Sequence, residues 1–365
     1  MRVFPERPAT RPAEGPAAWP GGPGDGDRKS FRRALAARLS RLGSKAAAAA
    51  LTVFCIVSVN FALIRFMPGD PVTHIVGEDE YLMLEASSPE TIEAIRAEYG
   101  LDGSLPAQFA AYLARTARLD FGSSYRTKGP VLDTALRRMK FTLLLAVPST
   151  ALAAVIGGAL GLLAGWRKGG LADMTASPVM GLLQTVPANC LAIAFLLLFS
   201  FRLGAFPLGG ITEGGLTGAE KALDILWHMA LPAAVLTLLK CSSDYMLMKS
   251  VVASLRDEEY VLTAMSRGYS EWRILTGHVL KNALCPFITS LCMQFGYILS
   301  GSMLVEVVFS WPGMGMLVHE SVAGKDFPML QTCFLFMGAC VVACNLLADA
   351  LVLAIDPRVR EGGIG

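Results

Sequence analysis

The stretch EEYVLTAMSRGYSEWRIL, Glu258 to Leu275, is rich in charged and polar residues, whereas the chain around it is written largely in Leu, Ala, Val, Phe and Gly. Over the 365 residues, 53% are hydrophobic and 17% are charged, and the mean hydropathy is +0.48. These values lie above those of ordinary soluble domains. The composition therefore predicts an integral membrane protein, and the quoted stretch marks a place where the chain leaves the lipid.

Working outward from this stretch, the chain contains six apolar runs that are long enough to cross a bilayer as helices. They cover residues 46–67, 141–165, 178–201, 229–248, 283–305 and 329–353. The predicted fold class is an all-α membrane protein with six transmembrane helices. The polar stretch then belongs to a loop at 254–282, between the fourth and fifth helices.

Basic residues predict how these helices are oriented, because positive charge gathers in cytoplasmic connections. A basic flank precedes the first helix, and the connections on its side of the membrane are richer in Lys and Arg than the outer ones, which hold Arg202, Lys221 and Lys325. We therefore expect both termini and the loop 254–282 to be cytoplasmic. Three basic residues at 137–140 fall outside, but they end a long loop, and long loops translocate largely regardless of charge.

The domain boundaries follow from changes in composition. Residues 1–27 carry six Pro and five Gly without periodicity, which predicts a disordered tail. The other expected parts are a basic flank with the first membrane helix at 28–67, an external loop subdomain at 68–140, a transmembrane core at 141–356 and a cytoplasmic tail at 357–365. In the external loop, SSPETIEAIRAEYG and AQFAAYLARTARL predict two helices.

Small residues form a stripe at strict four-residue spacing in the second apolar run, at Ala153, Gly157, Gly161 and Gly165. Such a stripe allows another helix backbone to approach closely. It predicts a packing surface.

Within the polar stretch, apolar residues recur at helical spacing and predict a short helix with one apolar stripe, made of Leu255, Val261, Leu262 and Met265. Gly268 is expected to end this helix, and Ser270 to begin a second one that runs to Pro286. Periodicity alone allows two interpretations: an amphipathic helix lying on the lipid headgroups, or a docking element for a cytoplasmic partner.

A family resemblance favours the second interpretation. YVLTAMSRG followed by HVLKNALCPFIT resembles the cytoplasmic loop of the permeases of binding-protein-dependent ABC importers, in the branch that moves dipeptides, oligopeptides and nickel. Five further strings resemble landmarks of that family and occur in the same order: RFMPGDPV, LDFGSSY, HMALPA, EVVFSWPGMGMLV and NLLADALVLAIDPRVR. Together the strings fall within residues 28–360.

The resemblance implies a multi-pass permease subunit of the cell inner membrane that forms half of a translocation pathway. Its partners would be membrane lipid, a homologous second permease, two ABC ATPase subunits and an external solute-binding protein. The loop would be a coupling helix in a groove of the ATPase, with the coupling residues Tyr260, Thr263, Ala264, Arg267 and Gly268. The chain departs from the branch at Leu262, where Arg is more usual.

The chain also lacks a G-x-x-x-x-G-K-[ST] phosphate loop, so ATP hydrolysis is expected on a separate subunit. The four histidines show no H-E-x-x-H spacing, and all eight cysteines lie in apolar runs. We therefore predict no catalytic residues, no metal and no cofactor. A net charge of +2 gives no electrostatic footprint for nucleic acid.

Charged and polar residues inside a spanning helix are costly and call for a reason. Lys240 and Asp244 lie four apart in the fourth run, and Asn345 and Asp349 lie four apart in the sixth. We predict that Lys240 and Asp244 pair on one helix face, either neutralising each other or lining the substrate path. All four are candidates for the translocation path.

Two alternatives stay open. The first concerns class: an ion-coupled secondary transporter acting alone would use Lys240, Asp244 and Asp349 for a coupling ion. The second concerns substrate, because peptide and nickel permeases share the landmarks; the short outer connection 202–228 leans slightly toward nickel.

Overall fold

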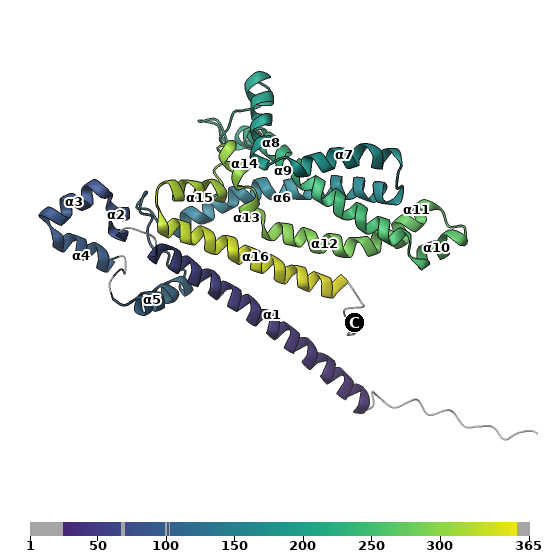
Figure 1. Cartoon of the computed structure of the whole chain (residues 1–365), viewed down its shortest axis with the longest axis horizontal. Coiled ribbons are helices and arrows are strands. Elements are labelled where there is room, and N and C mark those ends of the chain that lie inside the picture. The colour runs from purple at the N-terminus through teal and green to yellow at the C-terminus, as the bar shows by residue number, and fades with distance from the viewer. Residues whose placement is uncertain (1–24, 67–69, 99–100, 102, 356–365) are drawn as a thin grey trace, which may run out of the picture. The chain divides into compact units, whose positions relative to one another are not determined.

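The computed structural model describes residues 25–66, 70–98, 101 and 103–355 (Figure 1). Within these residues every regular element is a helix and no β-strand occurs, which confirms the all-α prediction. The chain divides into two compact units, residues 1–48 and 49–365. The predicted cytoplasmic tail, and the predicted disordered tail except for residues 25–27, lie outside the described residues.

The first apolar run belongs to a single long helix, α1 (Asp25–Arg65), which also includes the basic flank. The part suited to the membrane is Gly43–Leu63. In the second compact unit, α1 is joined to the last helix by a reciprocal amide contact. Asn60 Nδ2 donates to the Gln331 carbonyl at 3.4 Å, and Gln331 Nε2 donates to the Asn60 carbonyl at 3.2 Å.

The region predicted as an external subdomain contains four helices, α2 (Pro71–Val76), α3 (Glu78–Ser87), α4 (Pro89–Glu98) and α5 (Leu105–Ala117). Helices α4 and α5 match the two that the sequence predicts; α2 and α3 were not predicted. Asp70 joins the first three helices, because its carboxylate accepts hydrogen bonds from Val72 N at 2.9 Å and Tyr81 Oη at 3.2 Å and forms an ion pair with Arg96.

Four helices of the described chain are long and apolar enough to cross a membrane. They are α1, α6 (Val131–Trp166), α9 (Gly218–Arg256) and α16 (Phe327–Ile355). Helix α6 begins ten residues before the expected run, so the last ten residues of the predicted external loop, 68–140, are helical. These helices match the first, second, fourth and sixth predicted spans.

The third predicted span is not a straight helix. It is divided into α7 (Leu171–Thr185), α8 (Ala188–Phe195) and the π-helical η1 (Leu196–Arg202), with a bend of 104° between α7 and the rest. Pro187 lies at the bend, and proline disfavours helical geometry in the residue before it. Val186 accordingly has φ −79° and ψ 122°.

The fifth predicted span is also divided, into α12 (Leu280–Gly296), α13 (Ile298–Gly301) and α14 (Met303–Val308). Helix α12, with 17 residues, is at the lower limit of spanning length, and α13 and α14 are far shorter. The described residues thus hold four candidate spans, or five if α7 and α8 form one bent span, and the count of six stays a prediction.

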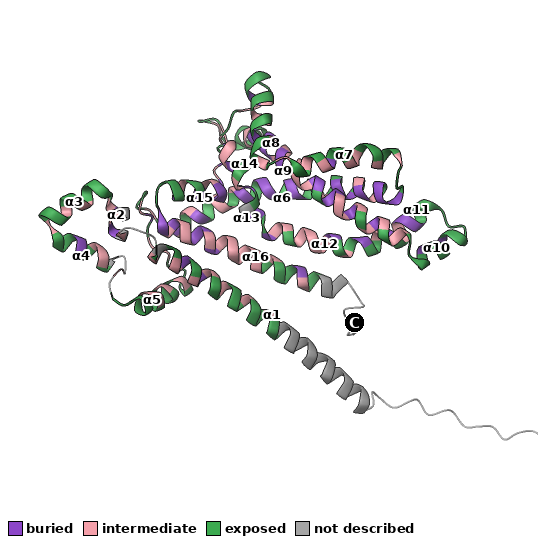
Figure 2. Ribbon diagram, viewed as in Figure 1, coloured by how far each residue is buried: buried purple, intermediate pink, exposed green. Residues whose placement is uncertain are grey.

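Helices α6 and α9 pack backbone to backbone along the predicted small-residue stripe. A Cβ atom on Gly157, Gly161 or Gly165 would lie 2.5–2.6 Å from a carbonyl oxygen of α9. Those oxygens belong to Cys241, Tyr245 and Lys249, which repeat at the same four-residue spacing. The packing role of the stripe is therefore confirmed, and Figure 2 shows buried residues along both helices.

The remaining helices lie near the ends of this pair. They are α10 (Glu259–Ser266), α11 (Glu271–Ile274), the π-helical η2 (Leu275–Val279) and α15 (Met314–Ala323). Figure 1 shows α6, α9, α12 and α16 side by side, with α10 and α11 at one end of the bundle and α14 and α15 nearer the other.

Candidate functional site

The polar stretch folds as two helices joined by a tight turn at Gly268. Gly268 N donates to the Met265 carbonyl at 2.9 Å, and Tyr269 N donates to the Ala264 carbonyl at 3.3 Å. This pair of bonds is the Schellman arrangement, which needs a residue with left-handed backbone just past the helix end. Gly268 supplies it with φ +76°, so the predicted end of the helix is confirmed.

Helix α10 has an inner and an outer face, and the apolar residues are shared between them. Val261 and Ala264 are buried, whereas Leu262 is 51% exposed and Met265 36% exposed. The prediction of one apolar stripe including both Val261 and Leu262 is wrong, because neighbouring residues point about 100° apart on a helix. The inner face packs into a core cluster that includes Trp166.

The outer face of α10 is an open, shallow surface. The residues that form it are Glu259, Leu262, Thr263, Ser266 and Arg267. An exposed apolar residue flanked by charged and hydroxyl side chains can accept a complementary protein surface.

The five predicted coupling residues therefore occupy different places. Thr263 and Arg267 lie on the outer surface, while Ala264 is buried on the inner face and Gly268 forms the turn. Tyr260 is partly exposed, and its hydroxyl accepts a hydrogen bond from Asn282 Nδ2 of α12 at 2.9 Å.

Helix α11 is attached to the turn that follows α6. Arg167 Nη2 forms an ion pair with Glu271 Oε2 at 3.1 Å, and Arg256 Nη1 donates to the Trp166 carbonyl at 2.8 Å. The Arg167 side chain, which donates a hydrogen bond to the carboxylate, lowers the pKa of Glu271, and a hydrogen bond from Trp166 adds to the effect. The carboxylate is thereby kept charged.

A second polar cluster joins α7 to α9, and no local feature of the sequence predicts it. Lys249 forms an ion pair with Asp173, and Lys249 Nζ also donates to Ser177 Oγ at 2.7 Å. The Ser177 hydroxyl lies 2.8 Å from that of Tyr245. The partners are about 70 residues apart, and only packing of α7 against α9 brings them together.

The second helix of the polar stretch does not stop at Pro286, contrary to prediction. Helix α12 continues through the proline to Gly296. Proline removes one backbone donor from a helix but the chain can still pass through it when packing holds both sides. Here Ala283 and Phe287, on either side of Pro286, are both buried in the core.

Lys240 and Asp244 interact electrostatically, but they do not form the direct ion pair that the sequence predicts. No Lys240–Asp244 ion pair within 4 Å occurs in the described part of the chain. Asp244 is fully buried, and its Oδ1 accepts a hydrogen bond from Gln294 Nε2 of α12 at 2.6 Å. On α16, Asn345 is exposed and Asp349 is half-buried. A role in the translocation path stays a prediction for all four.

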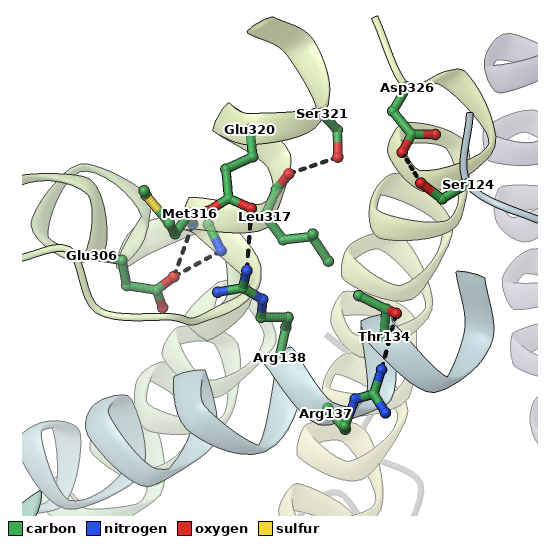
Figure 3. Close-up of polar contacts among 11 residues, drawn as sticks. Ser124, Thr134, Arg137, Arg138, Glu306, Met316, Leu317, Glu320, Ser321 and Asp326 are labelled. Carbon is green, nitrogen blue, oxygen red and sulfur yellow. Dashed lines mark hydrogen bonds and ion pairs between the residues drawn. The ribbon is translucent and has the colours of Figure 1, made fainter. Parts of the chain in front are cut away.

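A buried carboxylate organises the other end of the bundle (Figure 3). Glu306 is fully buried, and its Oε2 accepts hydrogen bonds from Gly315 N at 2.7 Å and Met316 N at 3.2 Å, at the first turn of α15. Its Oε1 accepts from the hydroxyls of Thr142 and Ser302, each at 2.8 Å. Negative charge is favourable at a helix N-terminus, so Glu306 ties α14 and α6 to α15.

Two further contacts in Figure 3 attach the loop before α6 and the start of α6 to the α15–α16 region. The Asp326 carboxylate accepts hydrogen bonds from Ser124 Oγ and from Tyr125 N, the latter at 3.1 Å. Arg138 pairs with Glu320 at 3.2 Å, so a basic residue placed outside by the topology has an acidic partner there. Phe121 of LDFGSSY also packs against the core cluster that includes Met314, Leu317 and Val318 of EVVFSWPGMGMLV.

Comparison with known proteins identifies the family. Residues 157–361 match the family model described as "Binding-protein-dependent transport system inner membrane component", and residues 39–146 match the model of its N-terminal region. The chain belongs to this family. The resemblance carried by the cytoplasmic loop and the ordered strings is thereby confirmed, and the protein is a multi-pass inner-membrane permease component.

The sequence similarity to known permeases extends over nearly the whole length of those relatives. The permease is 33% identical over 317 residues to a putative peptide transport system permease protein of Brucella suis, which covers 87% of this chain and 98% of the relative. It is 31% identical over 300 residues to a probable peptide ABC transporter permease protein of Sinorhizobium fredii, covering 82% and 92%. A glutathione transport system permease protein of Escherichia coli is 30% identical over 309 residues, covering 85% and 95%.

Proposed function

We propose that this permease forms half of the translocation pathway of an ATP-driven importer. A homologous second permease would complete the pathway, two ABC ATPase subunits would supply the energy, and an external solute-binding protein would deliver the substrate. Both termini and the loop 254–282 would lie in the cytoplasm.

The observation that carries this proposal is the pair of faces on α10. Val261 and Ala264 pack against the core and hold the helix in place. On the opposite face Leu262 is an exposed apolar side chain, and Glu259 and Arg267 lie on the same surface. A helix attached to the membrane domain on one side and open on the other suits docking into a partner's groove. The ion pair of Arg167 with Glu271 supports transmission of movement from this segment to α6.

The proposed substrate class is a peptide. The printed names of the similar proteins describe peptide and glutathione permeases, and glutathione is itself a small peptide. These names favour a peptide substrate over nickel, toward which the short outer connection 202–228 leaned slightly.

The test is Leu262→Glu in the complete transporter reconstituted in lipid vesicles. The new carboxylate would lie at the proposed contact between α10 and the ATPase subunit and would weaken that contact. We therefore expect the substrate-loaded binding protein to stimulate ATP hydrolysis less, and substrate uptake to fall. The matched control is Leu171→Glu, because Leu171 is 84% exposed, at the start of α7, on the same proposed side of the membrane.

Equal coupling in the Leu262→Glu and wild-type transporters would contradict the docking role of α10. The same vesicles also separate the two classes of transporter. Uptake by the purified chain alone, driven by an ion gradient and independent of ATPase subunits, would overturn the importer proposal and support an ion-coupled secondary transporter.

A further inference from the structure

Two polar atoms in the middle of the bundle are buried and accept no hydrogen bond from any described residue: Asp244 Oδ2 and Gln294 Oε1. They belong to side chains that already contact each other, since Gln294 Nε2 donates to Asp244 Oδ1 at 2.6 Å. Both atoms are acceptors when Asp244 is ionised. Buried polar atoms normally have partners, so this pair requires an explanation.

A single proton accounts for both atoms. A protonated carboxyl group has one O–H donor, and a primary amide has a carbonyl acceptor beside its N–H donor, so the two groups are complementary. We propose that Asp244 carries a proton on Oδ2 and donates it to Gln294 Oε1, which makes a neutral acid–amide pair that joins α9 to α12. The only bond formed is the O–H bond of the Asp244 carboxyl group, whose proton comes from the solvent.

The surroundings favour the neutral form. Asp244 is fully buried, and from α6 it is faced by Gly157, whose added Cβ would lie 2.9 Å from that of Asp244 and which brings no charge. From α12 it is faced by the uncharged Gln294. On its own helix the titratable neighbours are Lys240 and Cys241; the charge of Lys240 attracts an ionised Asp244, but the two side chains form no hydrogen bond and no ion pair within 4 Å among the described residues.

An ionised Asp244 fits these contacts poorly. A buried carboxylate without a cationic partner or several donors is strongly unfavourable, and Asp244 has one donor. The buried Glu306 illustrates the contrast, because its carboxylate receives four hydrogen bonds. Hydrogen-bond donors thus surround the carboxyl group of Glu306, whereas we infer that a proton neutralises that of Asp244.

The first test is infrared spectroscopy of the assembled transporter containing the full chain. Wild type minus Asp244→Asn should show the C=O stretching band of a protonated carboxylic acid, shifted in D₂O. Absence of this band at neutral pH would overturn the proposal. This measurement needs no substrate, so it does not depend on the proposed transport function.

The second test compares substitutions by their thermal midpoint and uptake rate. Asparagine has an N–H donor where the protonated acid has O–H, so Asp244→Asn should match the wild type in both, whereas Asp244→Leu and Gln294→Leu should lower the midpoint. Lys240→Met should leave the midpoint unchanged, because a neutral Asp244 needs no counter-charge. If Asp244→Asn instead loses as much stability as Asp244→Leu, or folds normally but does not transport, a fixed proton at this position is excluded.

Discussion

At the scale of single residues, the absence of a side chain decides how closely α6 can approach α9. An added Cβ on Gly161 would lie 2.6 Å from the Tyr245 carbonyl oxygen and 2.8 Å from Met248 Cβ. Real Cβ atoms do not approach other atoms so closely, and the nearest obstacle is backbone, which cannot rotate away. One methyl group would therefore push the helices apart.

We predict that Gly161→Ala destabilises the protein by about 1–3 kcal/mol, the usual cost of overpacking a core. The matched control is Gly277→Ala in η2, where an added Cβ would meet nothing within 4 Å. There the substitution should be neutral or stabilise by about 0.5–1 kcal/mol, because alanine favours helix more than glycine does. Thermal unfolding of the two variants in detergent gives the comparison; equal midpoints would show that the α6–α9 contact is looser than described.

At the scale of elements, the helical segment that follows the turn at Gly268 contains a π-helical segment, η2, between α11 and α12. A short π-segment amounts to one extra residue in an α-helix, often placed at functional positions. Both flanks keep their packing, since Ile274 before it and Ala283 after it are buried in the same cluster.

This geometry predicts an unequal response to single-residue deletions. Deleting the exposed His278 should convert η2 to α-helix and leave both flanks in register, so the thermal midpoint should change little. Deleting the exposed Met293 from regular α12 should rotate all that follows by about 100° and lower the midpoint strongly. A tolerated Met293 deletion would contradict the packing of α12 described above.

The elements also show what could be predicted from sequence. The stripe at Gly157, Gly161 and Gly165 predicted close packing because the requirement is local and repeats along one face. The division of the third and fifth runs was missed, because hydropathy measures transfer to lipid and not backbone continuity, although Pro187 was visible. The partner of Asp244 was missed because Gln294 is 50 residues away, beyond any rule of helical spacing.

At the scale of the whole molecule, the distribution of positive charge implies an orientation that the fold alone does not set. Lys168 follows α6, and Lys221 lies in the first turn of α9. If the chain between them crosses the membrane once, the two residues lie on opposite sides. The bent pair of α7 and α8 would provide that crossing.

We predict that a single cysteine at Lys168 is reached by an impermeant maleimide only from inside the cell, and one at Lys221 only from outside. Both residues are exposed, and the eight native cysteines would first be replaced by alanine. Labelling of intact cells and of inverted vesicles makes the comparison. Labelling of both positions from one side would mean that α7 and α8 enter and leave the membrane on that side, and the predicted topology would need revision.

The buried Glu306 has a consequence for how the molecule can change shape. Its negative charge is solvated in place of water by the backbone amides that open α15 and by the hydroxyls of Thr142 and Ser302. Parting α14 from α15 would strip a charge of its solvation shell inside an apolar environment, at a cost of several kcal/mol. We therefore expect α6, α14 and α15 to move together at this corner in any change of shape that the permease undergoes.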